Sequence, residues 1–138
     1  MQTVGMIQPE TPEDVRSMYE DVGPTAQVVV RETASAMQFD REEYADRVTS
    51  DVIETARDAL FASLLTVHHG TRAEFEAWCD DHPTFDREVM GGENVDWVVW
   101  HSIDFAETVV AATYQNEPTA AAGTLRRQVF GRHYRHQL

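Results

Sequence analysis

Apolar residues spaced three and four apart run through the first half of the chain and predict helices. The predicted helical segments are residues 12–22, 24–37, 40–69 and 71–82. The first begins with Thr11 as an N-cap and Pro12 at the first helical position, followed by acids in the first turn. The longest segment has a second possible start at residues 49–51, where three side chains of capping type stand together. The first half is therefore predicted to be almost wholly helical.

The pattern changes after Pro83, where apolar and polar residues begin to alternate. Strands are predicted over residues 86–90, 95–102 and 108–114, and a closing helix over residues 119–136. A Gly-rich turn at residues 91–94 separates the first two strands, and the third segment is also compatible with a short helix. Residues 1–10 either add a small edge strand or pack against the rest. The predicted fold is a single α+β domain over residues 1–138, with several helices packed on a small, mainly antiparallel sheet of about three strands.

Length and composition limit the class of protein. A chain of 138 residues, 42% of them apolar, is long enough for one domain with its own core. No run approaches the roughly 18 apolar residues of a membrane span, and residues 1–25 contain no basic, apolar leader. The single cysteine forms no internal disulfide and supplies no multi-cysteine zinc module. We therefore expect neither a membrane protein nor a secreted disulfide scaffold.

The charge balance is strongly acidic. The chain has 24 Asp and Glu residues, 11 Arg and no Lys, which gives a net charge of −13. In dilute buffer this charge opposes compaction, whereas in molar salt the Debye length falls to about 3 Å and the acids mainly keep the surface hydrated. Arg in place of Lys avoids a long apolar stem at the surface. The composition is typical of an organism that accumulates salt, and it predicts a halophilic, cytoplasmic protein.

Four segments spread along the chain carry a family resemblance. They are residues 55–65, 70–79, 98–101 and 124–135, which run TARDALFASLL, GTRAEFEAWC, VVWH and TLRRQVFGRHYR. Together they resemble an uncharacterised family of small haloarchaeal proteins over nearly the whole chain. The resemblance agrees with the halophilic composition. It implies no activity, cofactor or catalytic residue.

One candidate for chemistry is a metal centre. Cys79 and His82 are three residues apart, so one helix end can present both to a single ion. His101 on the central predicted strand and either His69 or His68, near the end of the long helix, complete the shell, with Asp80 or Asp81 as a substitute ligand. Zinc tolerates such a mixed shell, as in a zinc-binding protein or a metal-dependent hydrolase. Two alternatives stay open. Cys79 also suits an apolar core, and together with His82 and Asp81 it suits nucleophilic catalysis.

A second candidate is an anion site in the closing helix. Its residues are Arg126, Arg127, Arg132 and Arg135. No acid follows Glu117, so residues 1–119 carry a charge of −17 and residues 120–138 a charge of +4. A basic segment of this kind binds nucleic acid or a phosphorylated ligand. The alternative is that the helix docks on acidic helices of the same chain, and that Arg near its C-terminus offsets the helix dipole. Molar salt weakens phosphate contacts and therefore opposes the anion-site interpretation.

The predicted central strand, residues 95–102, is apolar on both faces. One face can be covered by helices of the same chain, and the other needs further helices or a second copy. We therefore expect a homodimer, formed through the sheet or the long helix. The leading functional hypothesis is a non-enzymatic interaction or regulatory protein. The sequence names no substrate or cofactor.

Overall fold

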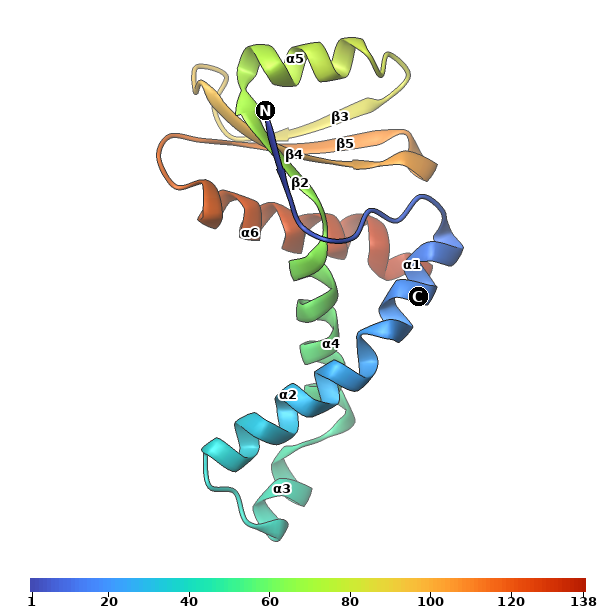
Figure 1. The fold of residues 1–138 in the computed structure, drawn as a ribbon, viewed down its shortest axis with the longest axis vertical. Coiled ribbons are helices and arrows are strands. Elements are labelled where there is room, and N and C mark those ends of the chain that lie inside the picture. The colour runs from blue at the N-terminus through green and yellow to red at the C-terminus, as the bar shows by residue number, and fades with distance from the viewer.

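The computed structural model describes residues 1–138 as a five-stranded sheet with helices on both faces and a helical arm that projects from it (Figure 1). The strands are β1 (Gln2–Val4), β2 (Val67–Thr71), β3 (Asp86–Met90), β4 (Trp97–Ile103) and β5 (Thr108–Tyr114). Their order across the sheet is β1-β2-β4-β5-β3. The predicted α+β class is confirmed. The expectation of about three strands was wrong, because β1 and β2 extend the sheet at one edge.

The sheet is mixed, because β3 runs parallel to β5 while the other neighbours are antiparallel. β5 lies between β3 and β4, so residues 91–94 do not form the predicted hairpin turn. The chain instead leaves β3 at Gly91, whose φ of +102° lies in the region that favours glycine. A Cβ at this position would collide with the side chain of Thr113. The segment with two alternatives, residues 108–114, is a strand.

β2 replaces the end of the helix that was predicted over residues 40–69. Helix α4 (Ser50–Leu64) ends at Leu65, whose backbone is extended, and the chain continues as a strand between β1 and β4. His68 and His69 therefore lie in the sheet, where successive side chains point to opposite faces. The prediction that they end a helix was wrong.

The remaining helices are α1 (Pro12–Asp21), α2 (Gly23–Ala36), α3 (Arg41–Arg47), α5 (Arg72–Asp80) and α6 (Pro118–Val129). Caps seen in the sequence begin α1, α3, α4 and α5. The side chains of Thr11, Asp40, Thr49 and Thr71 each accept a hydrogen bond from the backbone N–H three residues later. The cap at Thr49 confirms the break in the long segment. After α6 the chain closes with a π-helical turn and a 3-10 turn. No helix is both long and apolar enough to cross a membrane.

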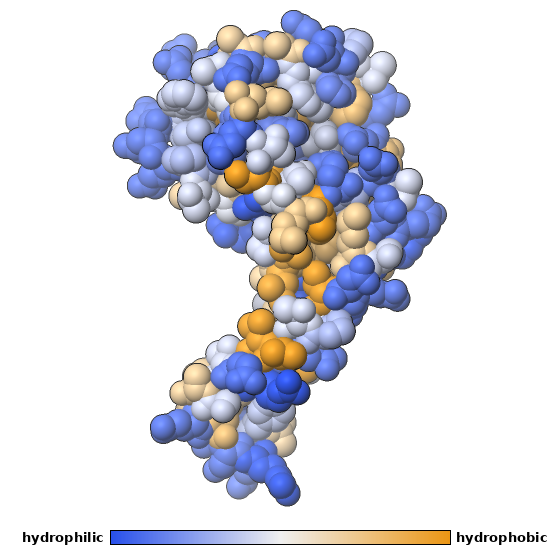
Figure 2. Space-filling model, viewed as in Figure 1, coloured by the Kyte–Doolittle hydropathy of each residue, from blue (hydrophilic) through white to orange (hydrophobic).

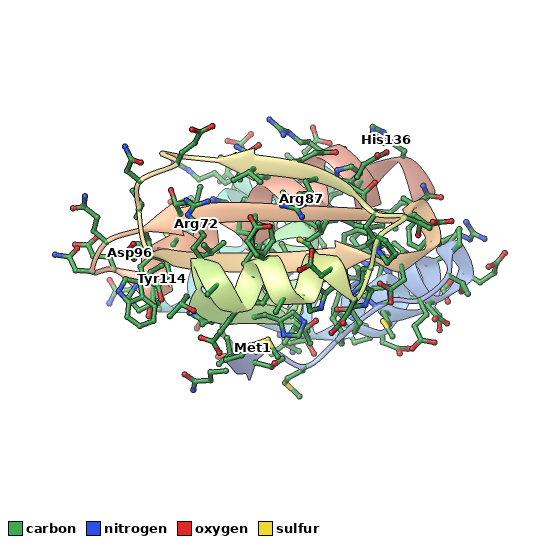
Figure 3. The ribbon with its side chains drawn as sticks, turned by 90° about the horizontal axis from the view of Figure 1, so that it is seen from above. Met1, Arg72, Arg87, Asp96, Tyr114 and His136 are labelled. Carbon is green, nitrogen blue, oxygen red and sulfur yellow. The ribbon has the colours of Figure 1, made fainter.

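Each face of the sheet packs on helices of the same chain. On one face, α5 places Phe75 and Cys79 against Trp100 of β4, and Figure 3 shows α5 lying over the strands. On the other face, α6, the end of α4 and α1 form the larger core, in which Phe61 and Tyr134 are fully buried. From Val98 to Ile103 both apolar faces of the central strand are therefore covered within one chain, and this part of the sheet needs no second copy to cover it.

The arm consists of residues 23–60, which include α2, α3 and the first part of α4 (Figure 1). α2 packs on α4 and buries Ala26, Val30 and Ala34. No residue from 35 to 60 is buried. The arm therefore keeps much of its apolar surface in contact with solvent.

Candidate interaction surface

An apolar groove runs along the arm between α2 and α4. Its volume is about 660 Å³, and Arg47 is the only charged residue in its lining. Val29, Met37 and Val52 line this groove and remain 42%, 61% and 42% exposed. Figure 2 shows hydrophobic side chains gathered on the narrow part of the molecule, below the largely hydrophilic surface around the sheet. We call this surface the arm groove. Its lining residues are Val29, Val30, Thr33, Ala34, Met37, Phe39, Arg47, Val48, Val52, Thr55, Ala56 and Ala59.

The groove follows from the local sequence of its two helices. The apolar stripe of α2 is wider than the contact that α4 makes with it, so Val30 and Ala34 become buried while Val29 and Met37 stay exposed. At the tip, the Arg47 guanidinium lies 5.7 Å from the centre of the Phe39 ring, a cation–π distance. The only charged side chain of the groove lining is therefore already in contact with an aromatic ring of the same arm.

Apart from Arg47, the charged residues of the arm lie outside the groove lining. Between Gly23 and Leu64 the chain has eight Asp and Glu residues and four Arg. None of the acids lines the groove. The surface is therefore an apolar strip bordered by a net negative charge.

The four residues predicted as metal ligands divide between the two faces of the sheet. Cys79 packs in the core under α5, and His82 stacks on Trp78 with ring centroids 3.8 Å apart. His69 and His101 point to the α6 face, where they contact aromatic residues of that side. No group of three or more His, Cys, Asp or Glu side chains lies close enough to hold a metal ion. The structure does not assemble the predicted centre.

His101 is 1% exposed and uses both ring nitrogens within the protein. Its Nδ1–H donates to the carbonyl of Thr66 at 2.6 Å, which leaves Nε2 to accept from the Tyr134 hydroxyl at 2.6 Å. Burial lowers the pKa of His101 to about 4, so the imidazole is neutral near pH 7. His101 therefore has no free nitrogen for a ligand.

The Cys79 thiol is expected to react slowly, which tests the nucleophile alternative. The residue is 5% exposed, and burial raises the pKa of its thiol, so reactive thiolate is scarce near pH 7. We expect modification by a disulfide reagent to be at least about tenfold slower in the folded chain than in the chain unfolded by urea at the same pH. Equal rates in the two states would contradict this burial and reopen a role for Cys79 in catalysis.

Two of the four arginines predicted as an anion site are paired with acids of the same chain. Arg132 lies 3.6 Å from Glu88 on β3, and Arg135 lies 3.2 Å from Asp58 on α4. The contact of Arg135 corresponds to the alternative in which the closing helix docks on acidic helices of the same chain, whereas the partner of Arg132 lies on a strand. Arg132 lies away from the others and joins none of the clefts that they line.

The other two arginines lie on α6 with different surroundings. Arg126 is half-buried and donates its Nε–H to the carbonyl of Leu65 at 2.8 Å, whereas Arg127 is exposed. Arg126, Arg127 and Arg135 line a cleft of about 460 Å³ between α4 and α6, which the carboxylate of Asp58 also lines. The structure thus brings three of the four together, with an acid among them.

The comparison with protein families matches almost the entire chain. Residues 6–135 match the model of a family described as a family of unknown function (DUF5809). The chain belongs to this family. No curated protein and no solved structure matches it. Membership of DUF5809 confirms the resemblance to a family without known activity.

Sequence reasoning found the apolar stripes of the arm but not their exposure. The helical spacing of Val29, Met37 and Val52 is the spacing expected of core residues, whereas the structure leaves them at the surface. One signal in the sequence opposed burial. Charged residues are dense in residues 40–54, which leaves α3 without a wide apolar face.

Proposed function

We propose that the protein is a non-enzymatic interaction protein that self-associates through the arm groove, with the grooves of two copies face to face. The observation that carries this proposal is the exposure of Val29, Met37 and Val52 on the arm. No residue from 35 to 60 is buried, so the arm has no closed core of its own there. Contiguous exposed apolar surface is typical of protein–protein contact sites. The sheet contributes no comparable surface, because its own helices cover both faces.

A second copy fits the arm groove for geometric and electrostatic reasons. Each arm supplies two packed helices, α2 and α4, and two such pairs provide the four helices that surround one apolar core in a bundle. A two-fold axis makes the same surface serve both partners. Because the lining has no acid, face-to-face packing buries no unpaired carboxylate.

The acids that border the groove make self-association depend on the salt concentration. Two arms, each with eight acids and four arginines between Gly23 and Leu64, repel each other in dilute buffer. Molar salt reduces the Debye length to about 3 Å and removes most of this repulsion. We therefore propose that the protein works in a salt-rich cytoplasm and that its dimer strengthens as KCl is raised from about 0.1 M to molar concentration.

Sedimentation velocity in molar KCl tests the proposal. Wild-type protein is expected to sediment at twice the 15.7 kDa mass of one chain. Val29→Glu and Val52→Glu each place a carboxylate in the arm groove, so both variants are expected at 15.7 kDa. The matched control is Val89→Glu, which changes a residue of similar exposure, 45%, on the edge strand β3 far from the arm, and it should remain a dimer.

Two results would contradict self-association through the groove. A wild-type chain that sediments as a monomer in molar KCl would show that the groove does not hold two copies together. Dimers of both Val29→Glu and Val52→Glu would place the interface elsewhere. Circular dichroism of each variant shows whether its helices are retained, so that loss of the dimer is separated from loss of the fold.

A further inference from the structure

A second cleft lies on the α6 face of the sheet, away from the arm groove. It has a volume of about 660 Å³ and is bordered by β1, β2, the ends of β4 and β5, and the first turns of α6. This volume is within the range of about 300–1,000 Å³ that is usual for small-molecule sites. Figure 3 shows Tyr114, one of its lining residues, at the end of the sheet from which the chain continues to α6. We call it the sheet-end cleft.

Two polar side chains of the sheet-end cleft lack a partner within the protein. The Nε2 atom of His69 is buried and forms no hydrogen bond. Arg126 uses only its Nε–H, which donates to the Leu65 carbonyl, and it belongs to none of the ion pairs of the chain. In a chain with 24 acids, a half-buried arginine without a carboxylate is unusual, because burying a charge without a partner is costly.

The electrostatics of these two groups are linked. Burial lowers the pKa of His69, and the nearby positive charge of Arg126 lowers it further. Burial also lowers the pKa of Arg126. A negative charge between the two side chains opposes both shifts, since an anion favours the charged forms of His69 and Arg126.

The nearest acid of the cleft is already engaged. Glu74 lies at the rim, where the amino group of Met1 pairs with its carboxylate and the backbone N–H of Thr71 donates to it. Its charge is thus balanced at the rim and does not reach Arg126. The interior keeps a net positive character.

An aromatic wall faces the polar groups. Trp97 and Tyr114 lie with ring centroids 6.4 Å apart and an angle of 24° between their planes, and the ring of His69 meets Tyr114 edge-on. Trp97, the first residue of the central strand β4, is 45% exposed, whereas Trp100 of the same strand is fully buried. A flat apolar group placed against this wall would cover surface that the chain itself leaves open.

From this arrangement we infer that the sheet-end cleft binds a small organic carboxylate. Its carboxylate contacts the free N–H groups of Arg126 and the Nε2 of His69, and its flat apolar part packs on Trp97 and Tyr114. Arginine suits this role because its planar head offers paired donors to a carboxylate. The other arginines of the closing segment are less suitable, because Arg132 and Arg135 already pair with acids.

Titration of the full chain with benzoate, followed by nuclear magnetic resonance in KCl of fixed molar concentration, tests this inference. Benzoate is expected to shift the indole N–H signal of Trp97 and to bind in the millimolar range. Benzyl alcohol, which has the same ring without the charge, should bind at least about tenfold more weakly, because it lacks the charge-assisted hydrogen bonds. Inorganic phosphate distinguishes a site for any anion from a site for an aromatic acid, since phosphate lacks the ring and should shift Trp97 far less.

Variants locate the site. Arg126→Gln should weaken benzoate binding at least about tenfold, because a charged hydrogen-bond partner is lost. Arg127→Gln, at the next position of α6 and outside the sheet-end cleft, is the matched control and should bind like the wild type. If Arg126→Gln does not fold, His69→Gln and Tyr114→Ala decide the question, because both keep the Trp97 signal and each should weaken benzoate binding.

The inference is overturned by any of three results. The first is that the Trp97 signal does not shift up to the solubility limit of benzoate. The second is equal affinity for benzoate and benzyl alcohol, and the third is an equal loss of benzoate affinity in Arg126→Gln and Arg127→Gln. If phosphate binds as tightly as benzoate, the site takes inorganic anions and the aromatic part of the inference is wrong. None of these measurements depends on the arm, so they do not test self-association.

Discussion

Lowering the pH from about 7 to about 4 is expected to reduce the free energy of unfolding by about 3 kcal/mol through His101 alone. Burial lowers the pKa of this side chain from 6.5 to about 4 in the folded chain. The unfolded chain therefore takes up the proton at a higher pH than the folded chain does. The stabilisation is fully present above pH 6.5 and is lost progressively as the pH falls toward the folded pKa, because a protonated imidazole cannot accept the hydrogen bond from Tyr134.

Urea unfolding of the wild type and His101→Gln across this pH range measures the effect. Carboxylates also titrate here, so the informative quantity is the difference between the two proteins. The variant is expected to be less stable at pH 7 and to lose about 3 kcal/mol less than the wild type on acidification. His136→Gln, which changes an exposed histidine of the C-terminal turn, is the control and should follow the wild type. Parallel curves for the wild type and His101→Gln would show that His101 is not held neutral by burial.

The helices were predicted where their limits are set by neighbouring residues. Thr11, Asp40, Thr49 and Thr71 cap helices through hydrogen bonds that span three residues, so a short window of sequence contains all the necessary information. The end of α4 lacks such a signal. Val67 continues the apolar spacing of the helix, and only the pairing of β2 with β1 and β4 makes the segment a strand.

Strand order was the least predictable part of the fold. β3 and β4 are consecutive and joined by a Gly-rich turn, the pattern of a hairpin. The structure instead inserts β5 between them, with β3 parallel to it. This arrangement places the half-buried Met90 against the larger core. The contact joins distant parts of the chain, so no local pattern of sequence contains it.

The candidate sites also depend on contacts between distant parts of the chain, which the sequence pattern does not contain. The stripe that includes Val29 is visible in the sequence, but its exposure depends on how little of α2 the helix α4 covers. His69 and Arg126 are distant in the sequence and meet only because β2 lies in the sheet on which α6 packs. The proposed metal centre failed to assemble for a related reason, since alternation along β4 points His101 away from the face that holds Cys79.

Phe61→Ala is expected to lower the free energy of unfolding by about 3–5 kcal/mol, the range usual for removing a buried phenylalanine. Phe61 is fully buried at the point where the arm joins the main core. Its ring meets those of Tyr19, Phe130 and Tyr134 at centroid distances between 5.7 and 5.9 Å. These partners come from α1 and the closing segment, so the cavity left by the substitution would weaken three contacts at once.

Phe85→Ala is the matched control, because the same atoms are removed from a half-buried ring that packs on the edge of the smaller core. Phe85→Ala should lower the free energy of unfolding by less than half as much as Phe61→Ala does, as measured by urea unfolding at the same KCl concentration. Phe61→Ala should also release the arm from the main core, because α4 is the only helix that passes from the arm groove to the sheet. Amide exchange is then expected to accelerate throughout α2 and α4 in Phe61→Ala but not in Phe85→Ala. Equal losses of stability in the two variants would mean that the joint between arm and sheet is no more tightly packed than the edge of the smaller core.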